Sequence, residues 1–196
     1  MTAEETKPEE TKPEETKPEP WLRGTLTDVP AVARGVLHAL ETAREDVARW
    51  CGGLTGVEVN ARPAGLPSVA FQVRHIAGSM DRMLTYAEGR LLSEQQKAAL
   101  GGEDEHGAMA HVLLRDFEKA VDAAMTRVRA LAGEDLETPR FVGRKRLPTT
   151  VGGLLVHVAD HTQRHVGQVV TTVKVVVADR GVLQADQGYE AGRSWL

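Results

Sequence analysis

Four stretches of the chain repeat apolar residues at intervals of three and four, the spacing that lines one face of an α-helix. They cover about residues 29–51, 69–88, 107–132 and 149–178, and a glycine follows each of the first three. Helices of this length, each with one apolar stripe, bury that stripe by packing together. The pattern therefore predicts an all-α protein, an up-down four-helix bundle.

The polar residues at the helix starts predict where the helices begin. Thr27 or Asp28 can cap the first helix, with Pro30 in its first turn, and Ser68 can cap the second. The long connection of residues 91–106 can start a short helical turn at Ser93. The segments between the helices are otherwise predicted as loops.

The apolar stripe of the last helix is interrupted by histidines. His157, His161 and His165 follow one another at intervals of four, so one helical turn separates each from the next. Imidazoles on a face that should be buried are costly unless something satisfies their ring nitrogens. A divalent metal ion would do so.

The second helix directs another imidazole at or near the core. His75 lies beside Ile76 at the edge of the apolar stripe, and in a bundle it can meet His161 and His165. Three neutral imidazoles can hold Zn²⁺, Ni²⁺ or a similar ion and leave at least one coordination position open. Three polar residues share the side of His75 and either line the mouth of a substrate site, pack, or are exposed to solvent: Gln72, Ser79 and Arg82.

Other readings of these residues stay open at this point. Buried histidines often only form hydrogen bonds, and two histidines four apart occur by chance. Without a Glu after the first histidine, the pair is not the metalloprotease motif. Asp160 is expected to be a solvated charge, and Cys51 a small buried apolar residue rather than a nucleophile.

The segment HVADHTQRHVGQ resembles the signature of the last helix in the DinB-like superfamily, the DNA-damage-inducible group that includes thiol-dependent S-transferases. The signature has two histidines four apart, here His161 and His165, followed by Gly167 and Gln168. VRHIAGSMDRMLTYAEG, around His75, is similar to the family's histidine-bearing second helix. The resemblance covers about residues 21–178.

This resemblance implies a divalent metal ion, with zinc or nickel favoured, held by His75, His161 and His165. His157 then contacts a ligand or packs in the core, because the last helix already supplies two ligands. One departure is Val166, where the family frequently has an Arg, so a contact made by that Arg is not expected here.

Composition and charge narrow the function classes. Of the 196 residues, 41% are apolar and only 4% aromatic, which suits an Ala/Leu/Val-rich helical protein. The net charge of −4 arises in residues 1–20, where three Glu-Glu-Thr-Lys-Pro repeats predict a disordered leader. The remaining residues are neutral overall, so no nucleic-acid binder is expected, and the basic loop around Arg144 is expected to be solvated surface.

The domain organisation follows from these patterns: a leader at 1–20, one bundle domain at 21–180 and a polar tail at 181–196. No run of eighteen apolar residues and no signal peptide is visible, so neither a membrane span nor export is expected. A single cysteine fits the reducing cytoplasm.

The expected function is a metal-dependent enzyme that activates a thiol or water for attack on a small electrophile, an S-transferase or a hydrolase. Its partners would be a small-molecule substrate and a low-molecular-weight thiol. The alternative is a non-catalytic metal-binding protein of the stress response, or a scaffold. A bundle with incidental histidines is a third reading, and a homodimer is compatible with all three.

Overall fold

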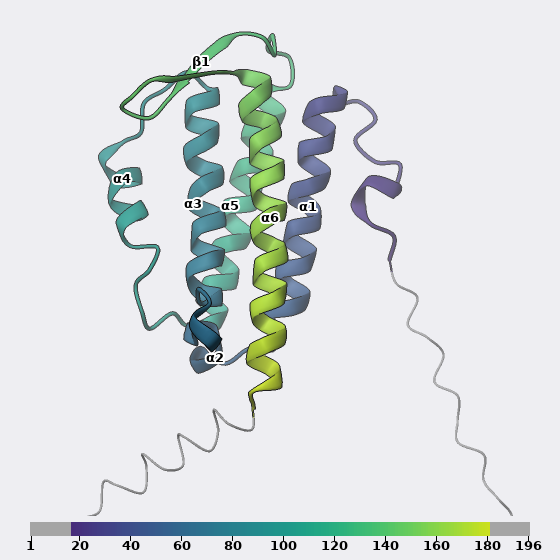
Figure 1. The fold of residues 1–196 in the computed structure, drawn as a ribbon. Helices are drawn as coiled ribbons and strands as arrows, with labels where there is room; N and C mark the ends of the chain where they lie inside the picture. The colour runs from purple at the N-terminus through teal and green to yellow at the C-terminus, as the bar shows by residue number, and fades with distance from the viewer. Residues whose placement is uncertain (1–16, 181–196) are drawn as a thin grey trace, which may run out of the picture.

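The computed structural model describes residues 17–180 (Figure 1). Residues 1–16 of the predicted leader (1–20) and the predicted tail at 181–196 lie outside the described residues, whereas Pro20, the last residue of the predicted leader, is buried and begins a helix. The described chain begins with a short 3₁₀ helix, η1 (Pro20–Leu22), which packs against the first long helix. No helix within residues 17–180 has the length and apolar character needed to cross a bilayer.

Four long helices form the body of the molecule, and the predicted all-α four-helix bundle is confirmed. The remaining elements are short and lie in the connections. In chain order the elements after η1 are α1 (Ala31–Cys51), α2 (Gly56–Asn60), η2 (Pro63–Gly65), α3 (Val69–Ala87), α4 (Glu94–Gly101), α5 (Ala110–Leu131), β1 (Pro139–Val142), β2 (Leu147–Thr150) and α6 (Val151–Ala178).

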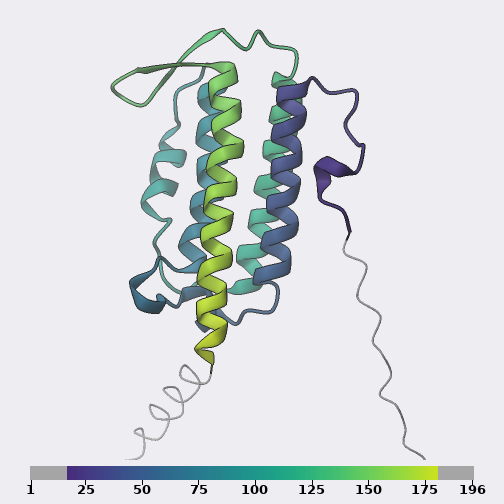
Figure 2. The same cartoon turned by 45° about the vertical axis from the view of Figure 1, so that its right-hand side comes forward.

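α6 packs between α1 and α3, and α5 packs against the same two helices from the other side (Figures 1 and 2). Arg127, near the end of α5, pairs with Glu88 at the end of α3, so these two helices run in the same direction. Arg180, after α6, reaches the carbonyl of Gly53 after α1, so α1 and α6 also run together. Direction therefore does not alternate strictly, because α4 carries the chain back along the outside of α3 before α5 begins.

The predicted helix starts hold in part. Ser68 accepts a hydrogen bond from the first turn of α3, as predicted. Ser93 starts an eight-residue helix through a capping box, which confirms the short turn expected there. α1 differs: Pro30 is its N-cap residue and no side chain caps it, so the predicted cap at Thr27 or Asp28 is wrong.

Two segments predicted as loops contain secondary structure. α2 lies in the segment between α1 and α3. β1 and β2 pair as an antiparallel hairpin, with Pro139 opposite Thr150 and Val142 opposite Leu147. The hairpin lies over one end of the bundle and leads directly into α6. Its turn, around Arg144, is exposed as predicted.

The apolar stripes of the four long helices form one core. The interior is mainly apolar, and each large apolar side chain removed from water stabilises the packed helices by roughly 1.5–3 kcal/mol. The largest apolar side chains below 2% exposure are Leu37, Leu40, Val47, Val59, Val69, Val73, Ile76, Met80, Leu84, Val121 and Leu155. α3 and α6 share an extensive seam within this core, and the histidines lie on it.

Candidate metal centre

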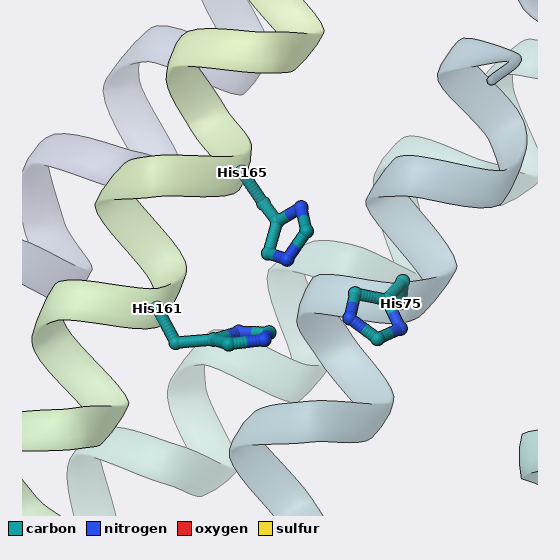
Figure 3. A group of neighbouring side chains, drawn as sticks. All are labelled: His75, His161 and His165. Carbon is teal, nitrogen blue, oxygen red and sulfur yellow. The ribbon is translucent and has the colours of Figure 1, made fainter. Parts of the chain in front are cut away.

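Three histidines from two helices converge on one point (Figure 3). His75 comes from α3, and His161 and His165 come from successive turns of α6. One ligand nitrogen from each ring lies within 4.8 Å of the other two. A Zn²⁺ ion about 2.0–2.1 Å from each nitrogen would hold nitrogens roughly 3.3 Å apart, so modest side-chain rotations complete such a set.

The helix geometry explains the convergence. His161 and His165 are four residues apart, so their rings leave the same face of α6, with centroids 4.4 Å apart. α3 runs antiparallel along that face and places the His75 ring 4.7 Å from His165 and 5.2 Å from His161. All three side chains are half-buried, so the point where they meet remains accessible.

Burial favours the neutral form of the His161 and His165 imidazoles by lowering their pKa values, and the neutral form is the one that binds a metal. Burial, followed by the neighbouring rings of His165 and His75, lowers the pKa of His161 to about 4. Burial and then His75 also lower the pKa of His165, and a hydrogen bond with Gln168 opposes that shift. At pH 7 neither ring on α6 therefore carries a proton that an ion would have to displace.

Among residues 17–180, one nitrogen of His161 forms no hydrogen bond. Its Nδ1 is buried and receives no hydrogen bond from any described residue. An unsatisfied buried polar atom is rare and costly, and a metal ion or an ordered water is the usual explanation. A donor set of three imidazole nitrogens suits a borderline-soft divalent ion such as zinc or nickel. Among residues 17–180, no fourth side chain joins this group, so coordination positions are left open.

Glu103 is a part of this site that the sequence did not reveal. It lies after α4, within the long connection, and its side chain is 7% exposed. Its Oε2 is 2.8 Å from Nδ1 of His75, and its Oε1 accepts a hydrogen bond of 2.6 Å from Arg82. Of the alternatives open for Arg82, a substrate mouth, packing or solvent exposure, the structure shows packing: the side chain is buried and paired with Glu103.

A pocket of about 300 Å³ lies between α6 and the start of α3; none of the three histidines lines it, but sequence neighbours of His75 and His165 do. Gln72, one turn before His75, lines it, as do Arg164 and Gln168, which flank His165 along α6. The remaining lining residues are Leu66, Pro67, Gly167, Thr171 and Thr172. Ser79 and Arg82 are buried and do not line it, so of the residues expected at a mouth only Gln72 lies there.

The other candidates remain outside the cluster. The ring of His157 is 5.2 Å from that of His161, but His157 does not belong to the group of converging nitrogens. Asp160 pairs with Arg164 on the surface, in keeping with a solvated charge. Cys51 is buried, and burial raises the pKa of its thiol to about 12, so it stays protonated and unreactive.

Comparison with known proteins yields a family and a fold. A family model described as the DinB superfamily matches residues 39–169, a range that contains all three converging histidines. The crystal structure of a conserved protein from Enterococcus faecalis superposes with a TM-score of 0.61 at 21% identity, covering 76% of this chain and 99% of that one. At that identity the likeness shows the fold alone. No curated protein matches.

Proposed function

The chain belongs to the DinB superfamily, and from that premise we propose that His75, His161 and His165 bind one divalent metal ion, zinc or nickel. We further propose that the protein is an enzyme that joins a low-molecular-weight thiol to a small electrophilic substrate. A bound ion of this kind supplies Lewis acidity, which makes a thiol or a water nucleophilic at neutral pH.

One observation carries the proposal: three imidazole nitrogens, two of them on rings with lowered pKa, lie within 4.8 Å of one another. Such a cluster is costly for a metal-free core, because partly desolvated imidazoles face one another across a mainly apolar seam. Metal binding turns that cost into a favourable interaction.

The residues around the triad favour a thiol over a water as the nucleophile. A metal-bound water keeps a pKa of about 7, so at neutral pH it is only partly deprotonated unless a general base assists it. Both oxygens of Glu103 are already engaged, one with His75 and one with Arg82, so this carboxylate is not free to take a proton. A thiol needs no such base, because coordination to a metal ion deprotonates it outright.

The pocket beside the triad is the proposed place for the substrate. Its volume of about 300 Å³ matches a small molecule rather than a polymer. Arg164 and Gln168 supply polar contacts on one side, and Leu66 and Pro67 an apolar wall on the other. Their role is to hold the electrophile beside the open coordination positions.

The test begins with metal analysis of protein purified without an affinity tag. Wild type is expected to retain about one zinc or nickel ion per chain, and His161→Ala to lose it, because a ligand is removed. A thiol-conjugation assay with a small test electrophile then follows on the loaded protein. Metal without turnover would favour the alternative, a non-catalytic metal-binding protein, and wild type without metal would refute the proposal.

A further inference from the structure

We propose that Glu103 is a positioning residue of the metal centre: its carboxylate fixes the ring of His75 so that one nitrogen faces the ion. The proposal rests on the metal binding put forward above. It assigns a function to the long connection between α4 and α5, which contributes none of the three histidines.

The contact with His75 sets which nitrogen carries the proton. A neutral imidazole has one N–H donor and one acceptor, and a carboxylate only accepts. Because Oε2 of Glu103 lies 2.8 Å from Nδ1 of His75, Nδ1 is the donor and Nε2 keeps its lone pair. Figure 3 shows one nitrogen of this ring facing the α6 histidines and the other facing away. A carboxylate behind a ligating histidine also makes the ligand more basic.

Glu103 is itself held in place by a buried cation. Arg82 donates to Oε1 at 2.6 Å, and the two side chains are 8% and 7% exposed. Burying two charges is costly, so such a pair is weak evidence of a role in stability alone. The geometry indicates a positioning role as well. Arg82 occupies Oε1 of Glu103 and so holds the carboxylate with Oε2 facing the ring of His75.

Gly78 provides the space for this arrangement. It lies in the middle of α3, where a glycine weakens a helix relative to alanine. A Cβ atom at this position would lie 2.6 Å from Nη1 of Arg82 and 2.7 Å from Oε1 of Glu103. Only a residue without a side chain lets both groups approach the helix backbone so closely.

The backbone around Glu103 is fixed by residues that lie outside the centre. The side-chain oxygen of Asn60, at the end of α2, accepts hydrogen bonds of 3.1 Å from the backbone N–H groups of residues 107–108. Arg74, on α3, donates to the carbonyl of Glu105. The segment that follows Glu103 is therefore tied to α2 and to α3, which helps to fix the position of Glu103.

The experiment measures Co²⁺ and Zn²⁺ affinity by competition with a chromogenic chelator, together with the visible spectrum of the Co²⁺ form. The variants are Glu103→Ala, Glu103→Gln and Gly78→Ala. Glu105→Ala is the matched control, an exposed carboxylate two residues along the same connection. Circular dichroism establishes a temperature at which every compared variant is folded.

Glu103→Ala is expected to bind either ion about 10–100-fold more weakly, the usual effect of removing the partner of a ligating histidine. Its Co²⁺ spectrum should change even at saturating metal, which a merely structural role would not cause. Glu103→Gln should fall between this variant and wild type, because its amide oxygen still accepts the proton of Nδ1. Gly78→Ala should also weaken binding, although it removes no charge, and Glu105→Ala should match wild type.

Wild-type affinity and an unchanged Co²⁺ spectrum in both Glu103 variants would overturn the inference and leave the proposed metal site intact. Wild-type protein that binds neither ion would instead overturn the metal site, and this inference with it. If Glu103→Ala does not fold, Glu103→Gln and Gly78→Ala decide by the same two readouts.

Discussion

Two clusters of charged side chains join elements of this bundle, and they differ in burial. Between α1 and α5, Arg44 pairs with Glu118 and Asp122, whose side chains are 47% and 66% exposed. Beside the histidines, Arg82 pairs with Glu103, and both side chains are less than a tenth exposed. The residue types are alike, but only the second cluster is shielded from water.

The difference in burial indicates different roles for the two clusters: the exposed one adds a little to stability, and the buried one is connected to the candidate metal centre. In an exposed ion pair both charges remain largely solvated, so the pair adds little to the free energy of unfolding, typically about 0–1 kcal/mol. A buried pair has lost its solvation, so each partner depends on the other and on further hydrogen bonds. Glu103 meets this need by bonding His75 as well as Arg82, which links the buried cluster to the candidate metal centre.

The largest expected effect is on metal binding at the triad. His75→Ala, His161→Ala and His165→Ala should each abolish stoichiometric binding, because each removes one of three ligands. His157→Ala is the control and should retain most of the metal, since its ring lies beside the cluster but outside it. Elemental analysis of the purified variants measures this, and equal loss in all four would mean that the triad is wrongly chosen.

The next effect concerns the stability of the metal-free protein. Glu103→Ala leaves the Arg82 guanidinium buried without its partner and should lower the free energy of unfolding by about 3–5 kcal/mol. Urea unfolding followed by circular dichroism measures the loss. If Glu103→Ala lowered the free energy of unfolding by no more than the removal of an exposed carboxylate does, water would have to reach Arg82. The two clusters would then not differ in their contribution to stability.

A smaller effect is expected from the dependence of the free energy of unfolding on pH. The pKa of His161 is lowered from 6.5 to about 4 in the folded state, so between these values the unfolded chain takes up a proton that the folded chain does not. The metal-free protein should therefore lose stability as the pH falls from about 6.5 towards 4, and this term should vanish above that window. Unfolding curves of wild type and His161→Asn measure it, and equal slopes would contradict the lowered pKa.

The smallest effect should come from the exposed cluster. Asp122→Ala is expected to change the free energy of unfolding by less than about 1 kcal/mol, because its carboxylate is two-thirds solvated and Arg44 keeps Glu118. Metal affinity should stay at the wild-type value. A large loss in either measurement would remove the distinction between the two clusters.

Periodicity was sufficient to predict the four long helices and two of the three converging histidines. His161 and His165 share a helical face simply by being four residues apart, and burial on that face followed from the Val and Leu residues around them. His75 was harder to place, because a residue at the edge of a stripe can turn either into the seam or towards solvent. Its place at the edge of the stripe made it a candidate, and the resemblance to the family then favoured it as a ligand.

Glu103 and the directions of the helices could not be predicted in this way. Glu103 lies in a connection without periodicity, and only the path of α4 along the outside of α3 carries it to His75. That same path makes α5 run parallel to α3, which no local pattern encodes. The hairpin was missed because each strand has only four residues and the segment between the strands is charged.

The most direct test of the account is a crystal structure of the zinc-loaded protein with an anomalous difference map at the zinc edge. The account predicts a single strong peak about 2.0–2.1 Å from one nitrogen each of His75, His161 and His165, with at least one further position held by solvent or a small ligand. A peak elsewhere, or density that leaves out His75, would contradict the claim that α3 and α6 together hold one ion.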